Sequence, residues 1–328
     1  MTERLVIGTR GSALALWQSE YVAQLVRDAH RGGVEVELRT FSTRGDRVLD
    51  KPLPEIGGKG LFTAELEEAL HAGAVDVAVH SLKDLPTDHP EGLGILAMPR
   101  RADPRDALVV RADHLDAFRS AMEADPAAFE PRNLLAAVPA GSTVGTSSLR
   151  RAAQLKATRP DLSVADVRGN VGTRLRKLDE GGYDAILLAC AGLDRLGLGD
   201  RIQRRLDGPW LGAAGQGAIA VQGRAGDARV AELLHSLEHR PTRLEVKAER
   251  GVLGGLGGGC SLPLGVRGVV ERDRLTLEAV LLDPAGSRAI RARRVGEATG
   301  TGADRLARIL CRDLLDRGAA TLLPAPPA

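Results

Sequence analysis

Short strand patterns alternate with helix patterns along the first part of the chain, and this alternation limits the possible folds more than any other feature. Residues 5–7 form an apolar strand pattern, and apolar side chains then recur every three or four residues from Leu14 to Val26, as on one face of a helix. Residues 34–38 alternate apolar and polar side chains, which is typical of a strand. Strands that alternate with helices pack as a sheet covered by helices. The sequence therefore predicts an α/β fold with largely parallel sheets.

The alternation is interrupted once and ends near residue 240. Residues 112–140 are rich in Ala, Asp and Pro and weakly patterned, so we expect a surface insertion there. The later part of the chain holds strand patterns and a final helix pattern, at residues 265–270, 275–282, 288–295 and 303–317. This order predicts a further, small α+β domain.

Charge and composition exclude several classes of protein. The 328 residues carry a net charge of +2, from 45 basic and 43 acidic residues, which argues against a general nucleic-acid-binding protein. No window approaches the roughly 20 apolar residues that cross a membrane. The first residues also lack the long apolar segment of a secretory signal. We therefore expect a cytoplasmic protein that contacts neither membrane nor nucleic acid.

Three cysteines are too few and too scattered for a disulfide framework or a four-ligand zinc site. Cys190 ends an apolar run and Cys311 lies in a helix pattern, so we interpret both as structural. Cys260 differs because it follows three consecutive glycines, which have no side chains to shield its thiol. His80 has no second histidine or cysteine at ligand spacing, so no metal site is predicted.

Polar clusters follow four of the predicted strands. In α/β sheets, ligands bind at the carboxyl ends of strands, beside helix N-termini whose backbone N–H groups attract anions. Most of the clusters set arginine beside small residues or glycine, and an arginine fork can bind a carboxylate through two hydrogen bonds. We therefore expect a ligand with several carboxylates. The clusters are Thr9-Arg10-Gly11-Ser12, Ser81-Leu82-Lys83-Asp84, Thr146-Ser147-Ser148-Leu149-Arg150-Arg151 and Arg168-Gly169-Asn170.

Two charged residues have a second interpretation that the pattern leaves open. Asp84 could cap a helix or pair with Lys83 instead of taking part in chemistry. Lys59 stands in a glycine-rich stretch that suggests a phosphate loop. The residue order of nucleotide-binding loops is absent there, however, so nucleotide binding has weak support.

Beyond these patterns, the chain resembles the porphobilinogen deaminases, also called hydroxymethylbilane synthases, from residue 7 to about residue 320. The resemblance rests on many short motifs that occur in the same order over nearly the whole chain. They include Thr43-Arg44-Gly45-Asp46, Val79-His80-Ser81-Leu82-Lys83-Asp84-Leu85-Pro86, Gly145-Thr146-Ser147-Ser148-Leu149-Arg150-Arg151, Arg168-Gly169-Asn170-Val171-Gly172-Thr173-Arg174-Leu175, Gly215-Gln216-Gly217 and Gly258-Gly259-Cys260.

The resemblance implies an architecture. Two βα domains like those of periplasmic binding proteins enclose the active-site cleft, and a small C-terminal α+β domain carries the cofactor cysteine. Residues 1–103 with 215–236 would form domain 1, residues 104–214 domain 2, and residues 237–328 the C-terminal domain. The chain would thus leave the first domain and return to it after the Gly215-Gln216-Gly217 motif.

The resemblance also implies a transferase of porphyrin and haem biosynthesis. Enzymes of this family deaminate four porphobilinogen molecules and condense them head to tail into the linear tetrapyrrole hydroxymethylbilane. Their primer is a dipyrromethane cofactor, which a thioether would join to Cys260 in this chain, and they use no metal. The expected partner is this small substrate, bound by a monomer.

Residue roles are carried over from the motifs that each residue matches. The catalytic positions match Asp84 and Lys83, and the cofactor-binding positions match both of these with Ser147, Ser148, Arg150 and Arg151. The expected substrate-binding residues are Arg10, Ser12, Arg168, Arg174, Arg195 and Gln216. Porphobilinogen carries an acetate and a propionate, which suit arginine forks. A fixed carboxylate at Asp84 would stabilise the cation that remains when ammonia leaves.

The main alternative function is a non-catalytic protein that binds a small anion on the same scaffold, because fold alone does not decide function. Cys260 and Asp84 together argue against it, since a binding protein needs neither a loaded thiol nor a carboxylate among cationic groups. Glu55, Gly212 and Gly257 depart from residues common among relatives, but none of them is a proposed site residue.

Overall fold

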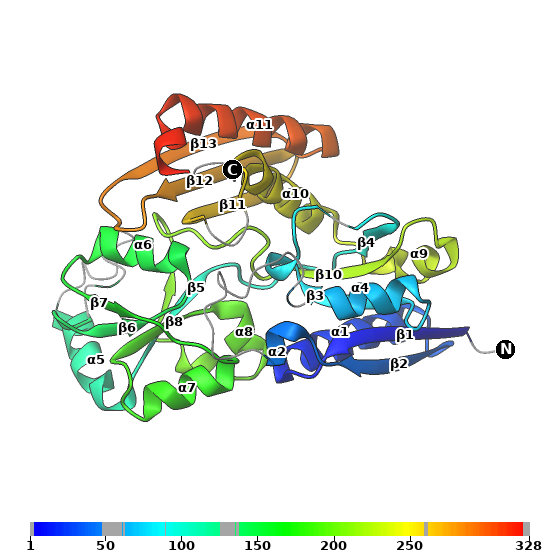
Figure 1. The fold of residues 1–328 in the computed structure, drawn as a ribbon, viewed down its shortest axis with the longest axis horizontal. Helices are drawn as coiled ribbons and strands as arrows, with labels where there is room; N and C mark the ends of the chain where they lie inside the picture. The colour runs from blue at the N-terminus through cyan, green and yellow to red at the C-terminus, as the bar shows by residue number, and fades with distance from the viewer. Residues whose placement is uncertain are drawn as a thin grey trace. The chain divides into compact units, whose positions relative to one another are not determined.

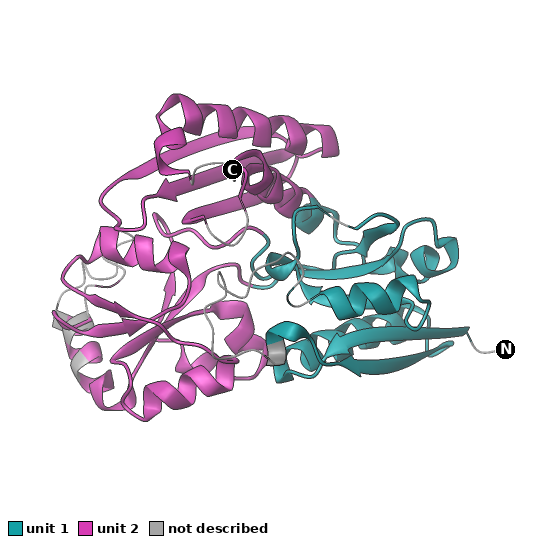
Figure 2. Cartoon of the chain, in the orientation of Figure 1, with its two compact units in different colours: residues 1–102, 215–243 teal, residues 103–214, 244–328 magenta. Residues whose placement is uncertain are grey.

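The computed structural model describes residues 3–47, 61, 63–88, 90–124, 135, 138–258 and 262–323. Within these ranges the chain forms mixed strands and helices (Figure 1). It divides into two compact units (Figure 2). Unit 1 is Met1–Ala102 with Gly215–Arg243, and unit 2 is Asp103–Ala214 with Leu244–Ala328. The chain therefore passes between the units three times.

Unit 1 holds a five-stranded sheet in the order β2-β1-β3-β10-β4. The strands are β1 (Glu3–Arg10), β2 (Val34–Phe41), β3 (Val77–Ser81), β4 (Leu93–Ala97) and β10 (Ile219–Arg224). Strand β1 pairs in parallel with β2 and β3, whereas β10 is antiparallel to β3 and β4. The helices of this unit are α1 (Ala13–Ala29), α2 (Arg44–Arg47), α4 (Ala64–His71), α9 (Ala228–Leu234) and the 3-10 turns η1 (Leu82–Asp84) and η6 (His235–Leu237).

Helices cover both faces of this sheet because its central strands are apolar on both sides. Leu5 and Ile7 of β1 pack with Val22 of α1 on one face. Val6, between them in sequence, packs with Leu66 of α4 on the other. The alternation of side chains along a strand thus gives each helix its own apolar surface.

Unit 2 holds a second five-stranded sheet, in the order β7-β6-β8-β5-β9. The strands are β5 (Asp106–Val110), β6 (Thr143–Gly145), β7 (Ser163–Ala165), β8 (Ala185–Ala189) and β9 (Arg204–Leu206). Strand β6 is parallel to β7 and β8, whereas β5 is antiparallel to β8 and β9. The accompanying helices are η2 (Ala112–His114), α5 (Leu115–Ala124), α6 (Leu149–Thr158), α7 (Val171–Asp179), α8 (Cys190–Arg195) and η5 (Gly199–Arg201).

The two five-stranded sheets have the same topology. In each, the fourth strand in the order, β10 or β5, runs against the other four. Each reversed strand is also the first strand after the chain passes from one unit to the other. The prediction of largely parallel sheets is confirmed only in part, because each five-stranded sheet has two parallel and two antiparallel pairings. The reversed strands β5 and β10 were not predicted. Both are buried at nearly every position, so neither shows an alternation of buried and exposed residues.

The prediction of a surface insertion at 112–140 holds for most of the described residues there, which are exposed, but not for three apolar ones. Residues 112–124 form η2 and α5. Phe118, Leu135 and Val138 are buried in the core of the second sheet. These apolar residues stand far apart among Ala, Pro and charged residues, so they produce no periodic pattern in the sequence.

Unit 2 also contains a three-stranded antiparallel sheet, which confirms the predicted small C-terminal α+β domain. Its elements are β11 (Leu264–Glu271), β12 (Arg274–Leu282), β13 (Ala289–Glu297), α10 (Arg240–Gly255), α11 (Gly300–Asp316) and η7 (Ala319–Leu322). Val280 and Leu282 of β12 pack with Ala153 of α6 and with Leu211, so the third sheet contacts α6 and the segment after β9. The predicted three-domain boundaries stay a prediction.

Candidate active site

The turn after β3, η1, carries Lys83 and Asp84. Its first residue, Leu82, is fully buried, and the Leu82 N–H donates to the Ala218 carbonyl at 3.0 Å. Ser81 occupies the cap position of η1. Lys83 is half-buried and Asp84 is exposed. The Asp84 carboxylate has no hydrogen bond or ion pair with any other described residue, so neither the cap nor the pair with Lys83 is formed.

The Gly215-Gln216-Gly217 motif lies against this turn within unit 1. Gly215 has φ of +72°, and a Cβ at this position would lie 2.9 Å from Leu82 Cγ. Only glycine allows this conformation and this close approach without strain. Gln216 is 1% exposed, and its carbonyl accepts a hydrogen bond from Arg101 Nε at 2.8 Å. The predicted residue Gln216 therefore follows a glycine that contacts η1.

Arg10 and Ser12 lie at the end of β1 and the start of α1. Ser12 is the N-cap of α1, where its Oγ accepts a backbone hydrogen bond of 3.3 Å. Gln18 of the same helix donates from Nε2 to Ser81 Oγ, at the end of β3, over 2.9 Å. Strands β1 and β3 are parallel neighbours. Arg10 and the turn η1 consequently lie at the same edge of the sheet of unit 1.

In unit 2, helix α6 starts after β6 and brings four predicted cofactor-binding residues together. Ser148 is its N-cap and accepts a hydrogen bond from the Arg151 N–H at 3.4 Å. Ser147 Oγ donates to the Val167 carbonyl at 2.6 Å. Arg150 and Arg151 follow in the first turn, and each is only 5% exposed. Burial of two neighbouring cations requires a counter-charge close by.

Asp106, the first residue of β5, supplies that counter-charge. Its carboxylate is fully buried and accepts two hydrogen bonds from Arg150, at 2.5 and 3.2 Å, and two from Arg151, at 2.7 and 2.9 Å. Trp210 Nε1 donates a fifth bond at 2.8 Å. Sequence reasoning missed Asp106. The signal was an acidic residue at the start of an otherwise apolar strand, together with two adjacent arginines that must be neutralised if they are buried.

The cluster of Asp106, Arg150 and Arg151 carries a net positive charge. Burial alone raises the pKa of Asp106, but the charges and hydrogen bonds of the two arginines outweigh it and hold this pKa far below its usual value. The carboxylate is therefore ionised at any ordinary pH, and it offsets only one of the two guanidinium charges. A ligand that carries carboxylates would complete the balance of charge.

Two further predicted residues, Arg168 and Arg174, follow β7. Asn170 caps α7, with its Oδ1 accepting from the Thr173 N–H at 2.9 Å. Gly169 has φ of +114°, and a Cβ there would lie 2.7 Å from the Thr173 side chain, so glycine is required. Arg174 Nε donates to the Gly169 carbonyl at 2.7 Å. This tight turn holds Arg168 and Arg174, both half-buried, at the start of α7.

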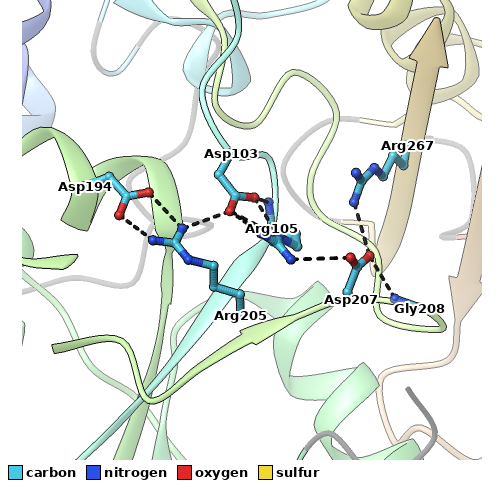
Figure 3. Close-up of polar contacts among 7 residues, drawn as sticks. All are labelled: Asp103, Arg105, Asp194, Arg205, Asp207, Gly208 and Arg267. Carbon is cyan, nitrogen blue, oxygen red and sulfur yellow. Dashed lines mark hydrogen bonds and ion pairs between the residues drawn. The ribbon is translucent and has the colours of Figure 1, made fainter. Parts of the chain in front are cut away.

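Arg195 ends α8, and the residue before it, Asp194, belongs to a network of ion pairs (Figure 3). Arg205 of β9 binds both oxygens of Asp194, at 2.7 and 2.8 Å, and one oxygen of Asp103 at 2.8 Å. Asp103 also accepts hydrogen bonds from Arg105 Nε and Nη2, at 2.9 and 2.8 Å. The network therefore ties the first residue of unit 2 to α8 and β9.

The same network continues to the third sheet through Asp207 (Figure 3). One oxygen of Asp207 lies 3.5 Å from Arg105 Nη1, and the other lies 3.3 Å from Arg267 Nη1 of β11. The Gly208 N–H donates to the same carboxylate at 2.9 Å. Exposed pairs of this kind contribute little stability individually. Their effect here is to hold the segment after β9 against both sheets of unit 2.

The three parallel strands β7, β6 and β8 are neighbours, and α7, α6 and α8 follow them directly. The residues at the starts of α6 and α7 and at the end of α8 therefore belong to connections that leave one edge of this sheet. Within each unit, several of the predicted site residues thus lie at one edge of the sheet. In unit 1 these residues are Arg10, Lys83 and Asp84. In unit 2 they are Ser147, Ser148, Arg150, Arg151 and Arg168.

The cysteines divide as predicted where the structure describes them. Cys190 and Cys311 are buried, at 0% and 7% exposure, which confirms their structural interpretation. Burial, together with the negative charge of Asp103, raises the pKa of the Cys190 thiol to about 12. Burial also raises the pKa of Cys311. Cys260 and Lys59 lie outside the described residues.

Comparison with known proteins identifies the family. Residues 5–232 match the porphobilinogen deaminase dipyromethane cofactor-binding domain, and residues 243–316 match the porphobilinogen deaminase C-terminal domain. Porphobilinogen deaminase of Nitratidesulfovibrio vulgaris strain Hildenborough is 45% identical over 324 residues, which cover 98% of this chain and 96% of that protein. The enzyme of strain Miyazaki F is 48% identical over 303 residues, 92% of this chain and 89% of that protein.

The comparison with solved structures also finds proteins that are much more distant from this chain. The BenM effector binding domain with its effector benzoate has a TM-score of 0.38 at 15% identity, over 72% of this chain and 90% of that chain. A similarity at that level supports no inference about function, whereas the sequence matches extend over nearly the full length of both proteins. The chain belongs to the porphobilinogen deaminase family.

Proposed function

We propose that this chain deaminates four porphobilinogen molecules and condenses them head to tail into hydroxymethylbilane. It is then a hydroxymethylbilane synthase, a transferase of porphyrin and haem biosynthesis with a dipyrromethane cofactor, and its membership of the porphobilinogen deaminase family supports this activity. The structural observation that supports it most is the net positive charge buried at Arg150 and Arg151. Each ring of the substrate and of the cofactor brings carboxylates that such a site can bind.

The hydrogen-bond donors of the described residues suit the carboxylates of a dipyrromethane. Each guanidinium group has five N–H donors, and three hydrogen bonds from each of Arg150 and Arg151 go to Asp106 and backbone carbonyls. The remaining N–H groups, with the hydroxyl of Ser148, can bind its carboxylates. Bound by a thioether to Cys260, the cofactor supplies the free pyrrole position to which the first substrate unit is joined.

Asp84 is proposed as the catalytic carboxylate. Loss of ammonia from porphobilinogen leaves a cation, and a fixed negative charge next to it lowers the energy of the transition state. An exposed carboxylate without a partner among the described residues is available for this role. It can also accept and return a proton during condensation. Lys83, adjacent and half-buried, is proposed to bind a carboxylate of the cofactor.

The proposed substrate-binding residues are spread over the strand ends of both units. They are Arg10, Ser12, Arg168, Arg174, Arg195 and Gln216. Arginine stays charged at any working pH, and its planar fork matches a carboxylate, so four of these residues suit the acetate and propionate groups of the substrate. Gln216, at 1% exposure, is limited to a contact through the few atoms that it leaves accessible.

The proposal includes a cytoplasmic monomer that acts on this small substrate and binds no nucleic acid. The net charge of +2 supports the last point. No helix in the described ranges is long and apolar enough to cross a membrane. Light scattering of the purified protein would test the monomer, and a mass of twice 34.6 kDa would contradict it.

The activity is tested at Asp84, with single-turnover condensation and the thermal midpoint measured on two variants. Asp84→Asn keeps the size and an acceptor oxygen but removes the charge, so turnover should fall by about 10²–10³. Asp84→Glu keeps the charge but displaces it, and should retain weak activity. Because the side chain has no partner among the described residues, neither change should lower the thermal midpoint noticeably.

The same assay separates an enzyme from a protein that only binds a small anion. The wild-type protein should release four ammonia molecules for each hydroxymethylbilane, because each condensation expels one. A protein that binds porphobilinogen without releasing ammonia would support the binding alternative. An Asp84→Asn protein that is folded, carries the cofactor and is fully active would reject the catalytic role of this carboxylate.

A further inference from the structure

Asp106 restricts the direction in which both buried arginines can point. Its Oδ1 accepts from Nη2 of Arg150 and from Nε and Nη2 of Arg151, while Oδ2 accepts from Nη1 of Arg150. The Nη1 groups of Arg150 and Arg151 also donate to the carbonyls of Leu211 and Leu187, at 2.7 and 3.0 Å. A guanidinium group is planar and rigid, so three bonds of this kind determine the plane and the rotation of each group.

The cluster of Asp106, Arg150 and Arg151 keeps a net charge that a ligand can neutralise. The two guanidinium groups and the carboxylate sum to one net positive charge, at side-chain exposures of 5%, 7% and 0%. A buried charge without full compensation is costly. Each arginine also keeps two N–H groups that donate to no described residue, since three of the five are used. Both observations indicate a carboxylate ligand.

The segment that holds Asp106 from the other side also contacts the sheet of the C-terminal domain. Trp210 Nε1 donates to Asp106 Oδ2 at 2.8 Å. The next residue, Leu211, is held by Gln154 of α6 through both its N–H and its carbonyl, at 2.9 and 3.0 Å. Leu211 also packs against Val280 of β12, in the sheet of the C-terminal domain. The cluster therefore joins the start of α6 to the domain whose sequence contains Cys260.

We propose that Asp106 is a positioning residue for the primer. It turns Arg150 and Arg151 so that their remaining N–H groups meet the carboxylates of a dipyrromethane, and it leaves one positive charge for them. Trp210 fixes Asp106 in turn. This inference rests on the proposed function, because it assigns to a third residue the orientation of two arginines that are themselves proposed to bind the cofactor.

Positioning and simple charge make opposite predictions for one substitution. Asp106→Asn removes a negative charge and so increases the positive potential around Arg150 and Arg151. If the arginines acted only through their charge, an anionic primer would bind this variant at least as well. If their orientation matters, the primer should bind less well, because an amide accepts at one atom only and repels a guanidinium at the other.

The experiment compares Asp106→Asn with Asp103→Asn by intact-protein mass spectrometry after folding has been verified. Asp103 is a matched control, since it also accepts guanidinium bonds, from Arg105 and Arg205, but contacts neither Arg150 nor Arg151. The fraction of folded protein that carries the primer should fall about tenfold or more in Asp106→Asn, the effect of losing a charge-assisted bond. It should stay at the wild-type level in Asp103→Asn.

A thermal double-mutant cycle separates positioning from a merely structural role. The midpoint is measured for wild type and Asp106→Asn, each with and without Cys260→Ser, which removes the attachment site. Positioning predicts that the stabilisation seen between Cys260→Ser and loaded wild type is lost when Asp106 is changed. A structural role predicts the same fall in midpoint in both backgrounds and an unchanged loaded fraction, and that result would overturn the proposal.

A milder variant covers the case in which Asp106→Asn does not fold. Trp210→Phe keeps a buried aromatic ring and removes the N–H that holds Asp106 Oδ2, together with part of the indole volume. It should lower the loaded fraction several-fold, and an unchanged fraction would count against the inference. A raised fraction in Asp106→Asn would favour simple charge and also overturn it. Wild-type protein without any primer would contradict the proposed function itself, and the positioning role with it.

Discussion

At the scale of single residues, burial and the neighbouring positive charges have opposite effects on the pKa of Asp106. Burial raises the pKa of this carboxyl group, and the two arginines lower it by a larger amount. In the folded protein, the pKa of Asp106 is therefore below the value of about 3.9 that an aspartate has in an unfolded chain. Such a group stabilises the folded state above the unfolded pKa, and this contribution is lost as the pH falls towards the folded pKa.

Because folding lowers the pKa of Asp106, the stability that this residue contributes should depend on pH. At pH 7, Asp106→Asn should lower the free energy of unfolding by about 3–5 kcal/mol, as expected when one partner of a buried ion pair is removed. Below about pH 4, the difference between wild type and variant should shrink by roughly 1.4 kcal/mol per pH unit. Urea unfolding at pH 7, 4 and 3 checks this. A difference that stays constant down to pH 3 would show that the Asp106 pKa is not lowered by folding.

The buried thiols give a second prediction at this scale. A thiol with a pKa of about 12, such as that of Cys190, stays protonated at pH 8 and does not react as a nucleophile. Iodoacetamide at pH 8 should leave Cys190 and Cys311 unmodified in the native protein and modify both after denaturation. Peptide mass spectrometry measures this. Rapid native alkylation of Cys190 would contradict the buried position that the structure gives it.

At the scale of elements, the position of Asp84 depends on how η1 meets a glycine of a distant segment. Gly215 has a positive φ, and its Cα approaches Leu82 so closely that a methyl group would overlap. Leu82 is the residue of η1 that is buried, and Asp84 is the residue that is exposed. The conformation of η1, which carries the proposed catalytic residue, is thus linked to the motif at residues 215–217.

Gly215→Ala should therefore affect stability and catalysis together. The positive φ alone should cost about 1 kcal/mol, and the overlap with Leu82 should move η1 and reduce turnover. Gly226→Ala is the matched control, because Gly226 has φ of +87° but no atom within 4 Å of the position that an added methyl group would take. Thermal midpoints and initial rates distinguish the two. Equal rates in both variants would indicate that the contact with Leu82 does not position Asp84.

The elements that could be predicted from the sequence are those with a local pattern. The apolar stripe from Leu14 to Val26 predicted α1, and alternation predicted β2. Strand β5, apolar on both faces, and β9, with two arginines in three residues, carry no such pattern. The cluster residues were found because they follow strands. Asp106 was missed because its partners are distant in sequence, and only the fold shows that Arg150 and Arg151 are buried around it.

At the scale of the whole molecule, each unit is assembled from two separate segments of the chain. Besides Lys83 and Asp84 in unit 1, the residues proposed to bind the primer lie at the start of α6, beside the second five-stranded sheet. Cys260 belongs to the sequence between α10 and β11 of the third sheet. These two sheets are joined by Leu211, by the packing of Ala153 against Val280, and by Asp207. Cys260 and the proposed carboxylate-binding residues of α6 thus belong to the sequence ranges of one compact unit.

The central claim is that Cys260 carries a covalent dipyrromethane that this unit holds in place. Intact-protein mass spectrometry of the purified chain tests it most directly. The measured mass should exceed the 34.6 kDa of the chain by one dipyrromethane, and Ehrlich's aldehyde reagent should turn the protein pink-red. Cys260→Ser should have the mass of its sequence alone and give no colour. Freshly purified, active wild-type protein with the unmodified sequence mass would contradict the account.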